Sequence, residues 1–121
     1  MKLLLLFSIL VSNIAFADSI SGIVSIEGNI QSGTLFIFAK KFGSKMPMPL
    51  AVKKIVNPKF PIKFSLSQKD AMMKQIPFKG PFVVTARLSP SGSAMDKSGV
   101  QASTTKKVEL GQKSINLILK P

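Results

Sequence analysis

Apart from Met1, the sequence contains five methionines, and these are the side chains whose type and number could support chemistry. Met46, Met48, Met72, Met73 and Met95 all fall in loop-like or helix-like stretches, outside the strand patterns. Thioethers are soft ligands that select Cu(I), so a convergence of these sulfurs would make a copper carrier. Methionine also fills irregular gaps over a core and forms adaptable surfaces for peptides. The residue types alone leave packing, peptide binding and Cu(I) binding open.

The other residue types argue against an enzyme. Histidine is absent, which removes an imidazole base, a Ser–His pair and any His-based metal site. The five acidic residues are far apart in sequence and show no metal-ligand spacing. Ser103-Thr104-Thr105-Lys106 matches the Ser-x-x-Lys pattern, but it falls in a predicted strand, whereas a working pair needs a serine at a helix start. We predict a non-catalytic protein without a cofactor.

The chain is strongly basic, with 17 Lys and Arg against 5 Asp and Glu. Three lysine pairs stand at predicted strand ends or on strands, namely Lys40-Lys41, Lys53-Lys54 and Lys106-Lys107. Arg87 is the single arginine, and Tyr and Trp are absent, which argues against a nucleic-acid reader. The lysines either keep strand edges apart or attract an acidic partner or an anionic lipid surface.

The N-terminus has the pattern of a secretory signal peptide. Met1-Lys2 is a short positive region, Leu3 to Val11 is an apolar run broken only by Ser8, and Ala15-Phe16-Ala17 has the small-x-small pattern of a cleavage site. The run is shorter than the roughly 20 apolar residues of a membrane span. We expect residues 1–17 to be removed and residues 18–121 to form one periplasmic domain with no membrane span.

Beyond residue 17 the chain contains short segments with strand character, separated by Gly, Pro and Asn turns. The segments are Ile20–Glu27, Thr34–Lys40, Leu50–Val56, Ile62–Leu66, Phe82–Leu88, Val100–Leu110 and Ser114–Lys120. Phe82, Val84, Ala86 and Leu88 share one face of their strand. This pattern predicts an all-β, immunoglobulin-like two-sheet antiparallel sandwich of about seven strands, with a small barrel as the alternative.

One short helix interrupts the strand pattern. Ser67 and Asp70 have the spacing of a capping box, which predicts a helix that runs to about Gln75. This helix would carry Met72 and Met73. If it meets the loops around residues 46–48 and 95 at one end of the sandwich, three or four sulfurs would converge.

Residues 33–99 resemble the C-terminal immunoglobulin-like periplasmic domain of CycH-type cytochrome c biogenesis proteins. Six sequence blocks carry this resemblance in the same order and at similar spacing. They are Thr34–Lys40, Met48-Pro49-Leu50-Ala51-Val52, Phe60–Leu66, Ala71-Met72-Met73, Val83–Ser89 and Ser91-Gly92-Ser93-Ala94-Met95. The family's acidic position after the fourth strand is occupied by Gln68 or Lys69 unless Asp70 replaces it.

The resemblance implies a sandwich fold and a part in delivering apocytochrome c for haem attachment. Family members carry membrane helices and a tetratricopeptide region ahead of this domain, so we expect a stand-alone exported copy with an accessory role. Its partner would be an apocytochrome or another maturation component in the cell envelope. The residues expected to bind this partner lie in the family-like blocks or beside them: Met46, Met48, Met72, Met73, Arg87, Ser91, Gly92 and Met95. The alternative Cu(I) set is the five methionines.

Overall fold

A computed structural model describes residues 18–28, 33–45 and 48–121. The predicted signal peptide and Met46 lie outside these residues. Almost all regular structure is β, with one 3-10 turn, η3, at Gln68–Asp70. The strands are β1 Ser19–Ile26, β2 Thr34–Lys41, β3 Ala51–Val56, β4 Ile62–Ser67, β5 Phe82–Ser89, β6 Gln101–Ser103 and β7 Ile115–Leu119. No helix in the described part of the chain is long and apolar enough to cross a membrane.

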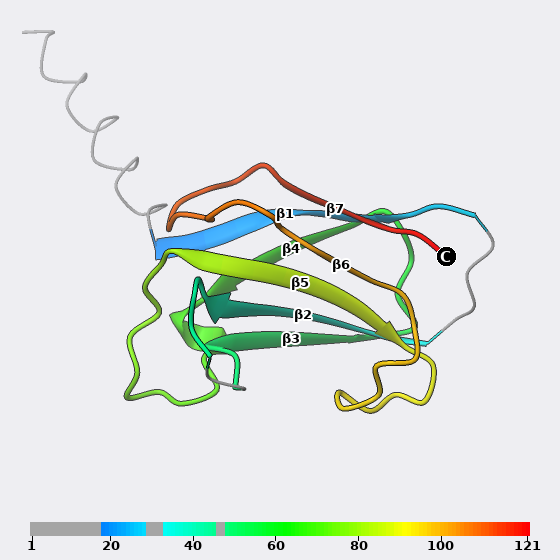
Figure 1. Ribbon diagram of the computed structural model, residues 1–121, viewed down its shortest axis with the longest axis horizontal. Coiled ribbons are helices and arrows are strands. Elements are labelled where there is room, and N and C mark those ends of the chain that lie inside the picture. Colours follow the sequence, from blue (N-terminus) through cyan, green and yellow to red (C-terminus); the bar gives the residue numbers. More distant parts are fainter. Residues whose placement is uncertain (1–17, 29–32, 46–47) are drawn as a thin grey trace, which may run out of the picture.

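The strands form two sheets that pack face to face (Figure 1). One sheet has the order β4-β1-β7 and the other the order β3-β2-β5-β6. Strands β2 and β5 pair over eight residues each, from Thr34 opposite Ser89 to Lys41 opposite Phe82. This long central pair fixes two ends of the sandwich. Below, the Lys41 end is the end at which β2 finishes, and the Thr34 end is the opposite one.

The core lies between the two sheets and confirms the predicted sandwich. The four β5 residues expected on one face, Phe82, Val84, Ala86 and Leu88, are all buried in it. The rings of Phe78 and Phe82 stack with 4.5 Å between their centroids, which ties the segment before β5 to the core. Alternation along β7 likewise buries every second side chain. Period-two burial is what makes each of these segments a strand rather than a helix.

One pairing departs from the expected antiparallel pattern. Strand β1 pairs antiparallel with β4 but parallel with β7, from Gly22 opposite Ile115 to Ile26 opposite Leu119. The two strands pass so closely that a Cβ at Gly22 would collide with the carbonyl oxygen of Ile115. The first and last strands of the domain therefore lie side by side.

The predicted helix through Gln75 is wrong beyond Asp70. The capping box is present, with the Ser67 N–H donating to Asp70 Oδ2 at 3.0 Å, but the turn stops there. Ala71 is extended and forms a bridge with Ala51, and the Met72 N–H donates to the Leu50 carbonyl at 2.9 Å. Pairing with the start of β3 replaces the helical hydrogen bonds that would have continued the helix.

The predicted strand Val100–Leu110 is also too long. Only Gln101–Ser103 forms β6, and an isolated bridge between Phe82 and Val108 resumes the pairing later. Between them the Thr104 hydroxyl accepts a hydrogen bond from the Val84 N–H at 3.0 Å. A side chain takes the place of a ladder partner here, so the segment leaves the regular sheet.

Candidate functional site

The four methionines that the structure describes are exposed rather than packed in the core. The exposed fractions are 47% for Met48, 47% for Met72, 40% for Met73 and 82% for Met95. Met48 and Met73 line the same pocket at the Lys41 end. Met95 lies in the loop after β5, at the Thr34 end, so the condition for all the methionine segments to converge at one end is not met. Among the described methionines, Met48, Met72 and Met73 are the ones that can act together.

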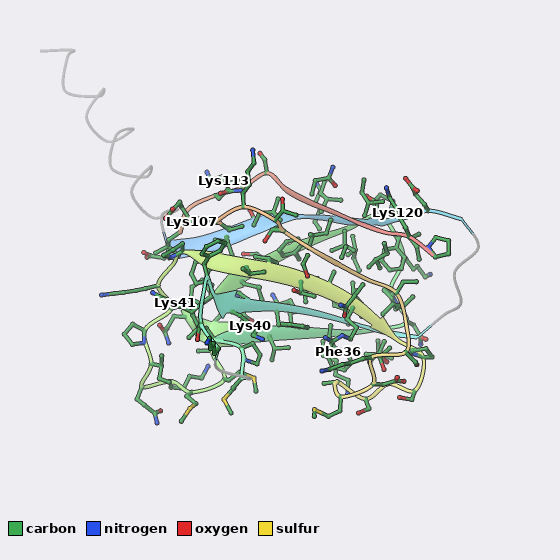
Figure 2. All side chains as sticks on the ribbon, in the orientation of Figure 1. Phe36, Lys40, Lys41, Lys107, Lys113 and Lys120 are labelled. Atoms are coloured by element: carbon green, nitrogen blue, oxygen red, sulfur yellow. The ribbon has the colours of Figure 1, made fainter. Side chains whose placement is uncertain are left out.

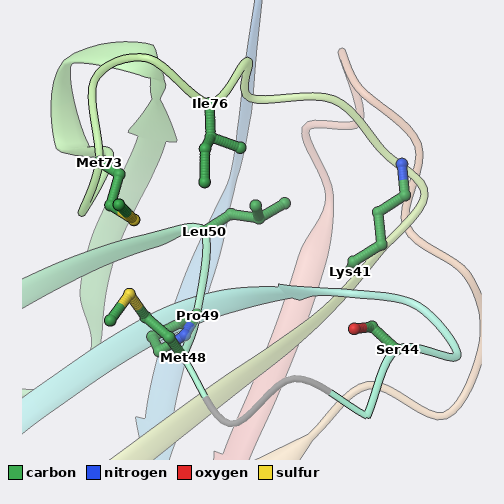
Figure 3. A pocket seen from close by; sticks show the side chains of 7 residues that line it. All are labelled: Lys41, Ser44, Met48, Pro49, Leu50, Met73 and Ile76. Atoms are coloured by element: carbon green, nitrogen blue, oxygen red, sulfur yellow. The ribbon is translucent and has the colours of Figure 1, made fainter.

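The pocket that Met48 and Met73 share is a mostly apolar depression between two loops. It is small, with a cavity volume of about 40 Å³, and it is partly open to solvent. Figure 3 shows Met73 and Ile76 on the segment after η3. Met48, Pro49 and Leu50 lie opposite them, at the end of the loop before β3. Lys41 and Ser44 complete its lining. The depression offers thioether and aliphatic surface to a ligand, with polar groups on one side only.

The side chain of Gln68 holds one wall of this pocket in place. Its Oε1 accepts from the Phe78 N–H at 2.7 Å, and its Nε2 donates to the carbonyls of Ile76 at 3.2 Å and Lys74 at 3.5 Å. The Ile76 N–H also donates to the Met73 carbonyl at 3.1 Å. One amide thus closes residues 68–78 into a compact loop whose inner face carries Met73 and Ile76.

Lys41 lines the pocket, and Lys107 lies at the same end of the molecule. Lys41 Nζ donates to the Gly80 carbonyl at 2.9 Å, and Lys107 Nζ lies 5.7 Å from the centre of the Phe42 ring. Figure 2 shows Lys41 and Lys107 at this end of the molecule, whereas Lys120 lies at the other. Asp70, the carboxylate beside the pocket, is already engaged by the Ser67 N–H and by Lys53 at 3.7 Å. The surface near the pocket is therefore positive.

Arg87 belongs to the opposite end and holds structure there. Its Nε donates to Gln101 Oε1 at 3.0 Å, and its Nη1 donates to the Ala94 carbonyl at 3.1 Å. The guanidinium also lies over the Phe38 ring, 5.1 Å from the ring centre. These contacts fasten the loop after β5 to the outer face of the four-stranded sheet, so Arg87 is a positioning residue for that loop.

The same loop contains the remaining residues predicted to bind a partner, Ser91, Gly92 and Met95. Gly92 has a φ of 84° and its N–H donates to Ser89 Oγ at 3.1 Å, so this glycine serves the turn. Ser91 donates its N–H to Asp96 Oδ2 at 3.3 Å. Met95 alone of the three is a large apolar group offered to solvent.

Asp96 organises the far side of this loop. Its Oδ1 accepts from the Ser98 hydroxyl at 2.6 Å and from the Ser98 N–H at 3.0 Å. The hydrogen bond from the Ser98 hydroxyl, followed by those from Ser91, holds the pKa of Asp96 well below its usual range. Hydrogen bonds to a carboxylate favour its charged form, which is the physical cause of this shift.

Comparison with known protein families identifies the family of this chain. The model of the cytochrome c-type biogenesis protein H Ig-like domain matches residues 14–119, nearly the whole sequence. This chain belongs to that family. The family membership and the observed sandwich confirm the resemblance that the six sequence blocks carry.

Two individual proteins show how far the similarity reaches. The cytochrome c-type biogenesis protein CycH of Pseudomonas aeruginosa is 38% identical over 81 residues, which are 65% of this chain and 18% of that protein. The chain thus spans less than a fifth of that relative. An alternative pilotin from the type II secretion system of Vibrio cholerae has a similar fold, with a TM-score of 0.53 and 18% identity over 84% of this chain and 94% of the pilotin. At that identity the likeness concerns the fold alone.

The CycH-like blocks separate into two groups in space. The block around Met48 and the block around Met73 meet at the pocket, and the block that ends at Met95 lies at the opposite end.

The sequence contained no direct signal for the role of Gln68, whose hydrogen bonds reach ten residues along the chain. Ile76 and Leu50 were also missed, because each reads as an ordinary apolar residue beside a turn.

Proposed function

We propose that this chain is a non-catalytic binding domain of the cell envelope that holds a protein partner during cytochrome c maturation. Membership of the CycH Ig-like family supports a role in cytochrome c maturation. An apocytochrome or another maturation component would be the partner. The leader pattern at residues 1–17 supports export.

The observation that carries the proposal is the apolar pocket lined by Met48 and Met73. A soluble domain with a closed core has no structural need for large apolar side chains exposed together at one end, and such patches mark interaction sites. Methionine is flexible and polarisable, so its side chains adapt to partners of different shape.

The Ser-x-x-Lys pattern does not add a catalytic candidate. The hydroxyl of its serine, Ser103, lies 2.7 Å from the hydroxyl of Thr85 in the neighbouring strand, which supports a structural role.

The proposal is tested by capture of the tagged mature domain from its own envelope after mild crosslinking, with mass spectrometry of the products. We expect haem-free c-type cytochromes or maturation components in the product. A variant with Met72 and Met73 both replaced by glutamine should capture less while remaining folded by circular dichroism. The matched variant Met95→Gln, at the opposite end, should capture normally. Recovery of neither class of protein, from a cell that makes c-type cytochromes, would contradict the proposal.

A second candidate function is Cu(I) carriage. Met48 and Met73 both present thioethers to one pocket, and Met72 adjoins Met73 in the chain, so a soft metal has two ligands nearby and a third within the same segment. Competition with a Cu(I) chelator provides the test. Stoichiometric binding that is lost in the Met48→Leu/Met73→Leu variant would support a carrier, because leucine keeps the apolar surface and removes the sulfur.

A further inference from the structure

Exposed apolar side chains are concentrated in two segments that border the pocket: residues 40–50, of which 46–47 are not described, and residues 68–81. Five large ones come from these segments and are at least 36% exposed: Phe42, Met48, Met72, Met73 and Ile76. The Phe42 N–H donates to the Pro81 carbonyl at 2.9 Å, which joins the chain just after β2 to the last residue of the second segment. The two segments thus make one continuous surface.

The same two segments are rich in lysine and poor in carboxylates. Residues 40–50 and 68–81 contain six lysines and one carboxylate, Asp70. Asp70 faces Lys53 and the Ser67 N–H, so its charge is already compensated. Lys41 and Lys74 each donate to a backbone carbonyl, at 2.9 Å and 2.7 Å. An ammonium group has three N–H donors, so both can still meet an anion.

Exposed apolar side chains together with lysines favour one class of partner over others. A positive rim favours a negatively charged partner, because charge complementarity raises the rate of encounter and fixes orientation. The apolar surface between Met48, Met73 and Ile76 is a depression. A depression accepts a side chain from a peptide, whereas insertion into a lipid surface needs apolar groups that project outward.

We infer that the pocket binds an acidic peptide segment and takes one apolar side chain of that segment between Met48 and Met73. Carboxylates on either side of this side chain then meet the lysines of residues 40–50 and 68–81. The inference rests on the proposed function, since it names the chemistry of the partner that the same surface would hold. Two features of the peptide are required together: an apolar residue for the pocket and acidic neighbours for the rim.

The test uses fluorescence anisotropy of the mature domain with short labelled peptides. The probe is an acidic peptide with one central leucine; its controls have serine in place of leucine, or lysine in place of each acidic residue. We expect the serine peptide to bind roughly tenfold more weakly, because burial of a leucine side chain is lost. The lysine peptide should not bind. Binding of the probe should weaken steeply between about 0.05 and 0.5 M salt, because screening shortens the range of surface charges.

Matched variants assign the binding to this end of the molecule. Met48→Gln/Met73→Gln and Lys41→Gln/Lys45→Gln/Lys74→Gln should each bind roughly tenfold more weakly. The controls at the Thr34 end are Val56→Gln/Met95→Gln and Lys59→Gln/Lys97→Gln/Lys120→Gln, which change the surface by the same number of groups. These should bind within about twofold of the parent, since charges beyond a Debye length are screened.

Three results would overturn the inference. Equal binding of the leucine and serine peptides would remove the role of the pocket. Equal weakening by both lysine variants would show attraction by net charge alone. Binding to vesicles of anionic phospholipid without binding to the peptide would assign the surface to a membrane. The proposed function would survive each of these results if capture from the envelope still depended on Met72 and Met73, so the two failures are distinguishable.

Discussion

Replacement of Gln68 by alanine should loosen the pocket wall while the sandwich stays folded. The side chain of Gln68 makes three hydrogen bonds, to the Phe78 N–H and to the carbonyls of Ile76 and Lys74. The bond at Phe78 is partly buried, and the two others are exposed. The alanine variant leaves the Phe78 N–H without this acceptor.

The magnitude follows from these three bonds. Loss of the partner of a buried N–H costs about 1–3 kcal/mol, and an exposed bond contributes at the low end of about 0.5–1.5 kcal/mol. Water can replace the two exposed bonds, so we expect a local loss of about 2 kcal/mol. That free energy corresponds to roughly a 30-fold change in an opening equilibrium. The loop closed by residues 68–78 should open this much more often.

Native-state amide hydrogen exchange measures this opening directly. The Phe78 amide should exchange roughly 30-fold faster in Gln68→Ala, while amides in β2 and β5 change little. Gln68→Glu keeps the acceptor for Phe78 but removes both donors and puts a carboxylate beside two carbonyl oxygens, so it should also accelerate exchange. Gln75→Ala, an exposed glutamine in the same loop, should leave exchange unchanged. Unaltered Phe78 exchange in Gln68→Ala would refute the role assigned to this amide.

Three further predictions concern the core, the β1–β7 contact and the loop after β5. Phe82→Ala removes a fully buried ring that stacks on Phe78, so urea unfolding should show a loss of about 3–5 kcal/mol; a loss below about 1 kcal/mol would contradict the packing. Gly22→Ala should lower stability by about 1–3 kcal/mol in the same assay, because its Cβ meets the Ile115 carbonyl. Asp96 should titrate below the ordinary carboxyl pKa of about 3.9 in a carbon-13 NMR titration, and Ser98→Ala should raise its pKa. Because the folded pKa is lowered, the contribution of Asp96 to stability is present above about pH 3.9 and is lost as the pH falls through the folded pKa. A midpoint at or above the ordinary value of about 3.9 would contradict the hydrogen-bond assignment.

The strands were predictable because each one is a local pattern. Alternation in residues 62–66 and 82–88 requires one buried face, and turn residues bound each segment, so the expected strands match the observed ones to within a residue or two at most ends. The wrong predictions concern segments whose ends depend on contacts with residues distant in the sequence. A capping box at Ser67 predicts a helical turn, but only the bridge between Ala71 and Ala51 ends it after three residues. The end of β6 likewise depends on the Thr104 hydroxyl and its Val84 partner.

The candidate site was predictable in its residue types but not in its assembly. Met48, Met72, Met73 and Met95 lie outside the strands, as expected, and all four are exposed. Which loops share an end depends on strand order, and that order is a property of the whole sheet. The loop of Met95 follows β5 and must leave at the Thr34 end, because β5 runs antiparallel to β2. No pattern within the loops themselves carries this information.

The parallel pairing of β1 with β7 also sets the order in which the domain can assemble. Strand β1 is the centre of its sheet, yet one of its two neighbours is the last strand of the chain. Contacts between residues so distant in sequence form slowly, because the intervening chain must first be brought together. A chain that emerges from its N-terminus first therefore leaves one edge of β1 unpaired until residues 115–119 arrive. Loss of residues 115–119 would remove an edge strand and leave the central strand β1 as the exposed edge of the sheet.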